Sequence, residues 1–221
     1  MHRSFVACSI IFTFILPTVI SAEELTDPRR PAAITTEEVP VVPAEVFERL
    51  NQYSNVRSAD MQGWAPDGKG ILISTRFGNA AQLHRVYTPG GRREQVTFFE
   101  EPVRGGFIPK SEDGSLLLSM SAGGNENYQV YLFDRSSFTT KLLTDGESRN
   151  SLGAVRDDGV QIVISSNKRN GRDTDLYIAD PRTPGSMEMI FETDGEYWYA
   201  ADWSHDAKTL LLGRYVSINE S

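Results

Sequence analysis

A short turn motif occurs four times along this chain at nearly constant spacing. The first copy runs from Trp64 to Gly68 (WAPDG) and the last from Trp203 to Ala207 (WSHDA). The aspartates of the four copies stand at 67, 113, 158 and 206, so the steps are 46, 45 and 48 residues. A repeat of about 40–50 residues that holds several short strands is typical of β-propeller blades. We therefore predict an all-β fold made of consecutive blades.

Each repeat can be followed beyond its turn. An apolar run comes first, at Ile71–Ser74, Leu116–Ser119, Ile162–Ser165 and Leu210–Gly213. A third strand then begins at Gln82, Gln129 and Asp175, and a fourth strand ends at Thr97, Thr144 and Thr193. The apolar runs are short, β-rich and bounded by turn residues, which favours strands that are buried on both faces.

The Asp-Gly pair of each motif predicts a tight hairpin turn. Glycine adopts positive φ without penalty, and the aspartate caps its own local backbone. Asp67 and its three equivalents are therefore predicted to be structural. Ala207 replaces glycine in the last copy and weakens the turn signal there. Trp64 and Trp203 are predicted to pack between neighbouring blades as core residues.

The first residues have the pattern of a secretory signal peptide. Arg3 gives a positive start, Ser4–Leu16 is almost wholly apolar, and Ile20–Ala22 resembles a cleavage site. An uncleaved membrane anchor is the alternative, because about 18 apolar residues are borderline for crossing a bilayer. Cleavage is the favoured interpretation, and it predicts an exported protein, either periplasmic or secreted.

Composition limits the classes of partner and site. Cys8, the only cysteine, lies within the predicted signal, so the mature chain offers neither a disulfide framework nor a thiolate metal site. The formal net charge is −8, and it becomes −9 when Arg3 leaves with the signal. No cluster of basic residues interrupts this negative charge. Nucleic acid and stable association with an anionic membrane are therefore not expected.

Four segments are predicted along the chain. They are a signal peptide (1–22), a proline-rich leader (23–43), a short amphipathic helix (44–56) and an incomplete propeller (57–221). The blades are predicted at about 57–103, 104–149, 150–197 and 198–221, which makes three four-stranded blades and half of a fourth. Because closed propellers need about four to eight blades, we expect exposed edges that favour self-association.

Six ordered stretches carry a further signal: Tyr53–Ser58, Gly63–Gly68, Leu72–Asn79, Gln95–Gly105, Leu143–Gly146 and Arg169–Asp173. Together they resemble the N-terminal part of bacterial prolyl oligopeptidase-type serine peptidases. The blade motif alone is shared by many exported propellers, including those of the Tol–Pal system. The ordered series of stretches is more specific than the motif.

The resemblance implies a propeller that lies over an α/β-hydrolase domain and admits peptides but not folded proteins. In that family the hydrolase follows the propeller and supplies a Ser, Asp and His triad. This sequence contains no Gly-x-Ser-x-Gly nucleophile elbow, and the region around Ser148 lacks the closing glycine. Neither His84 nor His205 belongs to a plausible triad. We therefore assign no catalytic residue and predict that this chain alone is inactive.

Cofactor and metal sites are also not assigned. A calcium-loop alignment with Gly171 at its sixth position places Lys168 and Tyr177 where oxygen ligands are required, so it fails. The acidic pair Glu100 and Glu101 is interpreted as a solvated connection. The resemblance leaves open that it holds a peptide amine, as propeller carboxylates do in some family members.

Two functions remain open on the sequence alone. One is the substrate-gating propeller of an exported serine peptidase, with peptide substrates bound through the hydrolase domain. The other is a non-enzymatic exported propeller that binds or scaffolds proteins of the envelope.

Overall fold

The computed structural model describes residue 27 and residues 29–219, which divide into two units between Val56 and Arg57. The predicted signal peptide, residues 1–22, lies outside the described residues. The two units are described separately below.

The first unit contains an extended leader and the helix α1 (Ala44–Ser54). Arg29 organises the leader, because its guanidinium pairs with Asp27 at 2.7 Å and lies 4.5 Å from the ring centroid of Phe47. The apolar residues of α1, among them Val46 and Leu50, are exposed, and the helix has no buried residue. No helix in the described part of the chain combines the length and the apolar character needed to cross a bilayer.

The second unit consists of four antiparallel sheets in chain order. Blade one holds β1 (Asp60–Trp64), β2 (Ile71–Thr75), β3 (Gln82–Val86) and β4 (Glu94–Gln95). Blade two holds β5 (Arg104–Phe107), β6 (Leu116–Met120), β7 (Gln129–Asp134) and β8 (Thr139–Leu142). Blade three holds β9 (Asn150–Val155), β10 (Ile162–Ser166), β11 (Asp175–Ala179) and β12 (Glu188–Phe191). The terminal sheet holds β13 (Tyr197–Trp203) and β14 (Leu210–Tyr215).

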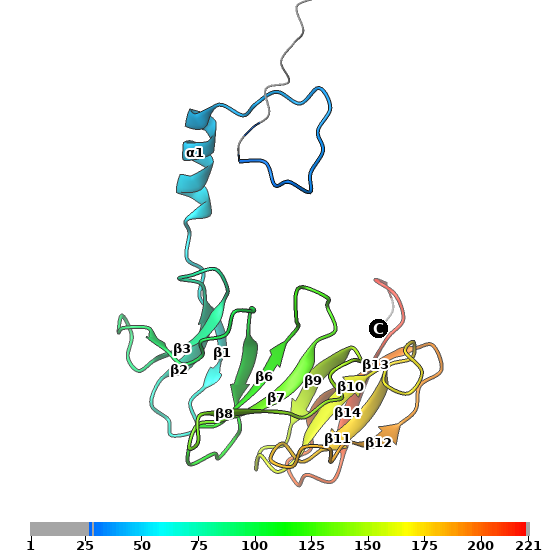
Figure 1. Ribbon diagram of the computed structural model, residues 1–221. Coiled ribbons are helices and arrows are strands. Elements are labelled where there is room, and N and C mark those ends of the chain that lie inside the picture. The colour runs from blue at the N-terminus through cyan, green and yellow to red at the C-terminus, as the bar shows by residue number, and fades with distance from the viewer. Residues whose placement is uncertain (1–26, 28, 220–221) are drawn as a thin grey trace, which may run out of the picture. The chain divides into compact units, whose positions relative to one another are not determined.

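Each sheet is a meander in which every strand pairs with its neighbour in sequence. Successive sheets lie side by side, with β1 against β5 and β9 against β13 (Figure 1). The described residues thus form three four-stranded sheets and one two-stranded sheet, together with one short helix. This is the predicted fold of three blades and half a blade.

The hydrophobic core lies between the sheets. Three apolar clusters join blade one to two, two to three, and three to the terminal sheet. The second strands of blades two and three, β6 and β10, contribute to the clusters on both of their sides, because alternate side chains point to opposite faces. Leu72, Leu117 and Val163 pack toward the following sheet. In the last three sheets, the residues on either side of this position pack toward the preceding sheet: Leu116 and Leu118, Ile162 and Ile164, and Leu210 and Leu212.

Burial on both faces was predicted for all four apolar runs, and for the last run this is wrong. Leu211 occupies the position of Leu117 in the repeat, yet 64% of its surface is exposed. The physical reason is that no described sheet follows β14, so the side chain that should face the next blade faces solvent.

Candidate functional site

The four turn aspartates are structural, as predicted. Each Oδ1 accepts the backbone N–H two residues further on: Asp67 from Lys69 (2.9 Å), Asp113 from Ser115 (3.0 Å), Asp158 from Val160 (3.0 Å) and Asp206 from Lys208 (3.3 Å). A hydrogen bond from the Ser111 hydroxyl is the largest cause that lowers the pKa of Asp113 to about 2. For Asp158 the largest cause is a hydrogen bond from Arg156, and its pKa is also lowered to about 2.

The residue that follows each aspartate adopts the same left-handed conformation. Gly68, Gly114 and Gly159 have φ of 70°, 69° and 71°. Ala207 has φ of 56°, so the terminal sheet keeps the same turn without the glycine that favours it.

The two histidines that the structure describes lie in different sheets, His84 in blade one and His205 in the terminal sheet, and their surroundings differ. His84 is buried in β3, where its ring lies 5.3 Å from the centroid of Phe77 and its Nδ1 lies 3.0 Å from the Gln82 carbonyl oxygen. His205 is exposed in the turn of the terminal sheet, 3.7 Å from Asp157. Ser148, at the sequence closest to a nucleophile elbow, donates to Asp145 at 2.5 Å as part of a turn. These side chains do not assemble a triad among the described residues.

A polar clamp that recurs in every four-stranded blade was not predicted from the sequence. In blade one, Thr97 Oγ1 donates to Gln82 Oε1 at 2.9 Å and accepts from the backbone N–H of Leu83. The Gln82 amide also donates to the carbonyl oxygens of Phe99 and Glu101. The clamp therefore fixes the start of the third strand to the connection that leads to the next blade.

Blade two repeats this clamp with the same residue types. Thr144 Oγ1 donates to Gln129 Oε1 at 2.6 Å, and Gln129 Nε2 donates to the Ser148 carbonyl oxygen at 2.6 Å. Asn150 extends the clamp, since its Nδ2 lies within hydrogen-bond distance of three acceptors: the Tyr128 and Ser148 carbonyl oxygens and Gln129 Oε1. Because the amide nitrogen has three acceptors, the orientation of Asn150 is fixed.

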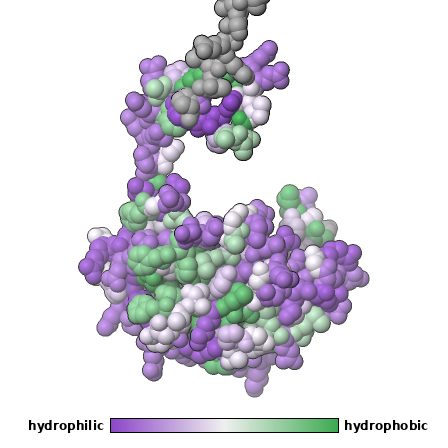
Figure 2. Space-filling view, viewed as in Figure 1, coloured by the Kyte–Doolittle hydropathy of each residue, from purple (hydrophilic) through white to green (hydrophobic). Residues whose placement is uncertain are grey.

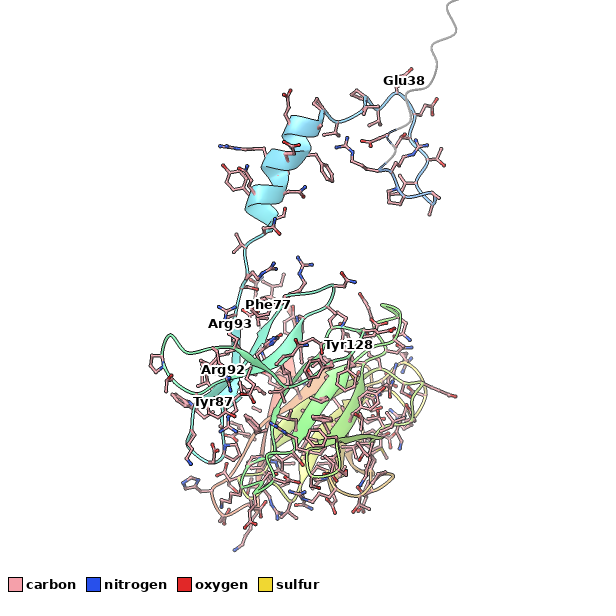
Figure 3. The ribbon with its side chains drawn as sticks, turned by 60° about the vertical axis from the view of Figure 1, so that its left-hand side comes forward. Glu38, Phe77, Tyr87, Arg92, Arg93 and Tyr128 are labelled. Carbon is pink, nitrogen blue, oxygen red and sulfur yellow. The ribbon has the colours of Figure 1, made fainter. Side chains whose placement is uncertain are left out.

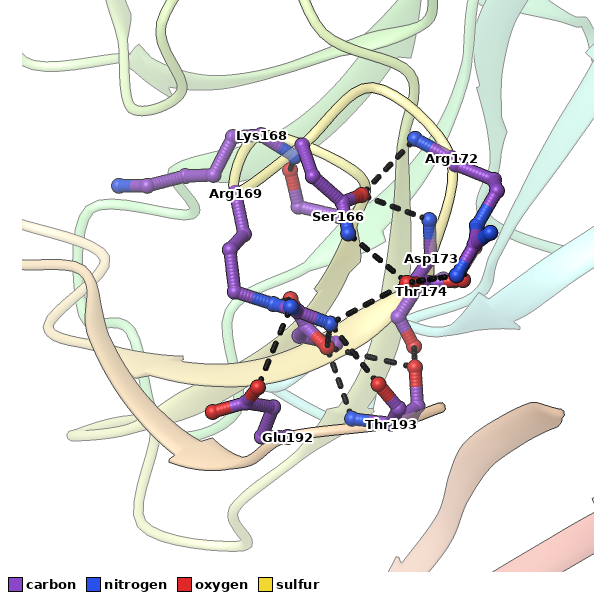
Figure 4. Close-up of polar contacts among 10 residues, drawn as sticks. Ser166, Lys168, Arg169, Arg172, Asp173, Thr174, Glu192 and Thr193 are labelled. Atoms are coloured by element: carbon purple, nitrogen blue, oxygen red, sulfur yellow. Dashed lines mark hydrogen bonds and ion pairs between the residues drawn. The ribbon is translucent and has the colours of Figure 1, made fainter. Parts of the chain in front are cut away.

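In blade three a charged pair replaces the neutral glutamine (Figure 4). Asp175 Oδ1 accepts from the backbone N–H of Thr193 at 2.8 Å, and Arg169 supplies the donors that a glutamine amide would otherwise provide. Its Nε donates to Asp175 at 2.7 Å, and its Nη2 donates to the Thr193 carbonyl oxygen at 2.8 Å. Burial raises the pKa of Asp175, but Arg169 and Thr193 outweigh burial, so the pKa is lowered overall.

The carboxylates near the rejected calcium loop are thus engaged by arginines. Arg172 donates to Asp173 at 2.9 Å, and this hydrogen bond is the largest cause that lowers the pKa of Asp173 to about 2. Among the described residues, no group of three or more His, Cys, Asp or Glu side chains is arranged to hold a metal ion. Absence of a metal site remains a prediction for the whole chain.

A hollow of about 500 Å³ lies on blade one. Phe77, His84, Gln95, Phe99 and Glu100 are among its lining residues. The guanidinium groups of Arg57 and Arg93 lie 5.5 and 5.8 Å from the Phe77 ring centroid. Phe77 and Arg93 lie close together at one end of the blade (Figure 3). The face of Phe77 is thus in cation–π contact with two arginines, while Glu100 contributes a carboxylate to the lining of the hollow.

The two residues of the acidic pair have different surroundings. Glu100 is exposed and lines the hollow on blade one. Glu101 instead accepts the backbone N–H of Gly123 at 2.8 Å, so it connects the segment before β5 to the loop between β6 and β7. The structure therefore gives Glu101 a structural role in the connection between blades.

A second hollow, of about 410 Å³, lies between the first strands of blades two and three. It is lined by Arg104, Gly105, Ser119, Tyr128, Asn150, Ser151 and Leu152. Arg104 and Tyr128 are exposed, whereas Asn150 is buried and held by the clamp of blade two. The fixed clamp gives this hollow a rigid floor.

A third hollow, also of about 410 Å³, is almost entirely apolar. It is lined by Trp64, Gly70, Ile71, Val86, Tyr87, Thr88 and Pro89, a set that we call the head face. Figure 2 shows apolar side chains gathered over the part of the molecule where blade one lies. The prediction that Trp64 packs between blades is wrong, since 74% of its surface is exposed. Trp203 does pack against the cluster between blade three and the terminal sheet.

No protein-family model matches this chain, and none of the curated proteins matches it. Its fold is similar to TolB from Acinetobacter baumannii, with a TM-score of 0.53, 23% identity and coverage of 71% of this chain. It is also similar to a putative TolB from Agrobacterium tumefaciens (TM-score 0.48, 19% identity, 72% of this chain covered). A further similar structure is an oligogalacturonate lyase from Vibrio parahaemolyticus (TM-score 0.48, 16% identity, 67% covered).

The chain spans only part of each of these proteins: 37% of the Acinetobacter TolB, 58% of the putative TolB and 43% of the lyase. At 23% identity, the likeness to TolB concerns the fold alone. The described sheets are those of a β-propeller fragment.

The sequence does contain a signal for the clamps. Gln82 and Gln129 both begin a third strand, and each is followed 15 residues later by the threonine that binds it. Asp175 stands at the same place, and its threonine follows 18 residues later. An alignment of the repeats on these polar positions is therefore enough to identify the clamps.

Proposed function

We propose that this chain is the propeller portion of an exported prolyl oligopeptidase-type serine peptidase. The observation that carries the proposal is the ordered series of family-like stretches, which fold into successive blades. Gly63–Gly68 forms the first turn of blade one, Leu143–Gly146 follows the last strand of blade two, and Arg169–Asp173 joins the central strands of blade three. The order of these stretches thus coincides with the order of the blades.

In this proposal the chain limits access and contributes no reacting group. Arginine–aspartate pairs such as Arg85 with Asp67 and Arg169 with Asp175 are engaged in its turns and clamps. The hollow between the first strands of blades two and three is a surface that a peptide could contact on its way to a hydrolase domain. Peptide hydrolysis then depends on residues outside this sequence.

The test is to isolate the complete reading frame that encodes this chain and to treat its product with a fluorophosphonate probe, which labels reactive serines. The expected result is labelling at a serine within a Gly-x-Ser-x-Gly sequence C-terminal to residue 221, together with hydrolysis of short peptides. The 221-residue chain is the matched control and should remain unlabelled. A complete product without such a serine would overturn the proposal.

A second candidate is a non-enzymatic exported propeller that binds envelope proteins. The observation that favours it is that the described histidines, serines and carboxylates named above are held in turns, pairs and clamps rather than in a reactive arrangement. In that case the complete reading frame gives no labelled serine. Chemical crosslinking in intact cells should then recover a specific protein partner, and replacing exposed residues of the hollows should abolish its capture.

A further inference from the structure

A row of paired side chains, three in each four-stranded blade and two in the terminal sheet, lies on the side of each sheet that faces the preceding sheet position. In blade two the row is Phe107, Leu116 and Phe133, which are paired across β5, β6 and β7. All three belong to or pack against the cluster shared with blade one. In blade three the row is Val155, Ile162 and Ala179, and it packs on blade two in the same way.

The rows of the first and last sheets complete this pattern. In the terminal sheet the row consists of Trp203 and Leu210, which pack on blade three. In blade one the row is Trp64, Ile71 and Val86, paired across β1, β2 and β3. This row forms the centre of the head face. Unlike the rows of the other three sheets, it has no sheet packed on it among the described residues.

The opposite side of the terminal sheet is the complementary surface. Leu211 stands at the position from which Leu72, Leu117 and Val163 contact the row of the next sheet. Tyr197 and Tyr215 pair across the two strands on the same side, and the ring of Tyr199 covers Gly213. We call this exposed aromatic side the tail face: Tyr197, Tyr199, Leu211 and Tyr215.

We infer that the head face of one copy of this chain binds the tail face of a second copy. The three interfaces between sheets within the chain support this inference. In each of them the middle residue of one second strand (Leu72, Leu117 or Val163) packs against the row of the next sheet, and the proposed contact joins the same two positions in different copies. The contact is heterologous, and such contacts give a closed ring if the rotation between subunits closes. The described residues of each chain contribute four sheets, so two chains supply eight, which lies within the range of about four to eight blades in closed propellers. The expected species is therefore a head-to-tail dimer with two equal interfaces.

This inference concerns the 221-residue chain by itself and does not rest on the proposed function. The first measurement is the mass of the purified chain in solution by light scattering after size exclusion and by sedimentation velocity. A dimer is expected. Trp64→Glu and Leu211→Glu should each raise the dimer dissociation constant about thirtyfold or more, because each places a charge at the centre of both interfaces.

Phe98→Glu is the matched control, since Phe98 is as exposed as Trp64, at 78%, and belongs to neither face. This control should leave the dimer intact. Circular dichroism of all variants verifies that the sheets persist, so loss of the dimer cannot be confused with unfolding.

Mixing the two disrupted variants separates the head-to-tail arrangement from other dimers. A ring with one Trp64→Glu chain and one Leu211→Glu chain has both charges at one interface and leaves the other interface native. The mixture should therefore recover dimer, although neither variant dimerises alone. General destabilisation of the chain would not be rescued in this way.

Several outcomes would overturn the inference. A chain that stays monomeric at tens of micromolar would overturn it. Acrylamide quenching of tryptophan fluorescence would then tell whether Trp64 is exposed or is shielded by another part of its own chain, and either result contradicts the dimer. A dimer abolished by Trp64→Glu but unaffected by Leu211→Glu would indicate contact between two head faces. Species larger than the dimer that grow with concentration would indicate a rotation that does not close.

Discussion

The second strands of blade two and of the terminal sheet, β6 and β14, have nearly the same apolar sequence but opposite surroundings. Leu117 in blade two is 1% exposed, whereas Leu211, at the same repeat position, is 64% exposed. Both lie in the middle of an apolar run of three leucines. The difference shows that the sequence of a blade supplies apolar side chains on both faces of the sheet. Whether those side chains are buried depends on the presence of a neighbouring sheet on each face.

The largest effect is expected from shortening these two leucines. Leu117→Ala should lower the free energy of unfolding by about 2–5 kcal/mol, because it leaves a cavity between blades two and three. Leu211→Ala should change it by about 0.5 kcal/mol or less at concentrations where the chain is monomeric. Urea unfolding followed by tryptophan fluorescence measures both. Similar losses for the two variants would break the comparison.

The clamp of blade three gives the second prediction. Asp175→Asn should cost about 1–3 kcal/mol, because it removes the charge that Arg169 binds at 2.7 Å in a buried position. Asp157→Asn, at an exposed side chain, is the control and should be neutral within about 0.5 kcal/mol. If Asp175→Asn were also neutral, the charged pair would be equivalent to the neutral glutamine clamps of blades one and two.

The hairpin turns sharpen the comparison further. Gly159→Ala in blade three should cost about 1–3 kcal/mol, since a Cβ there would lie 2.4 Å from the Pro109 carbonyl oxygen of blade two. In the terminal sheet the reverse change, Ala207→Gly, should stabilise by about 0.5–1 kcal/mol because it relieves a left-handed alanine. Gly68→Ala is the control, with open space around the added atom and a cost of about 1 kcal/mol. Thermal unfolding of the four proteins would contradict this account if Gly159→Ala and Gly68→Ala behaved alike.

The smallest effect is the dependence of stability on acid. Asp113 and Asp158 have pKa values lowered from 3.8 to about 2 in the folded chain. A lowered pKa means that these carboxylates stabilise the fold above about pH 4 and lose this contribution as the pH falls toward 2. Asp113→Asn should therefore flatten the fall in stability between pH 4 and pH 2, as measured by urea unfolding at a series of pH values. An unchanged slope would show that the Ser111 hydrogen bond does not favour the charged form.

Much of the fold was predictable because its signals are local. The Asp-Gly turns, the apolar runs and the starting residues of the third strands each depend on a few neighbouring residues, and the structure contains all of them. Even Ala207 adopts the predicted turn, in which Ser204 and Asp206 both accept from the backbone N–H of Lys208, as Ser111 and Asp113 accept from that of Ser115.

The surroundings of the two tryptophans could not be predicted in the same way. Trp64 and Trp203 stand in equivalent motifs, yet the first is exposed and the second packs on blade three. Whether such a residue is buried depends on a sheet that is distant in sequence, and local pattern carries no information about it. The clamps were predictable in principle from the spacing of glutamine and threonine, but only when the repeats are aligned on polar residues instead of apolar ones.

The clamps also lie at the joints between successive sheets. Gln82 binds the carbonyl oxygens of Phe99 and Glu101, and Gln129 binds that of Ser148, so each clamp holds the chain where it turns from one sheet into the next. Each clamp is therefore placed to restrict the angle at one joint between two sheets, in addition to the apolar cluster that fills that joint.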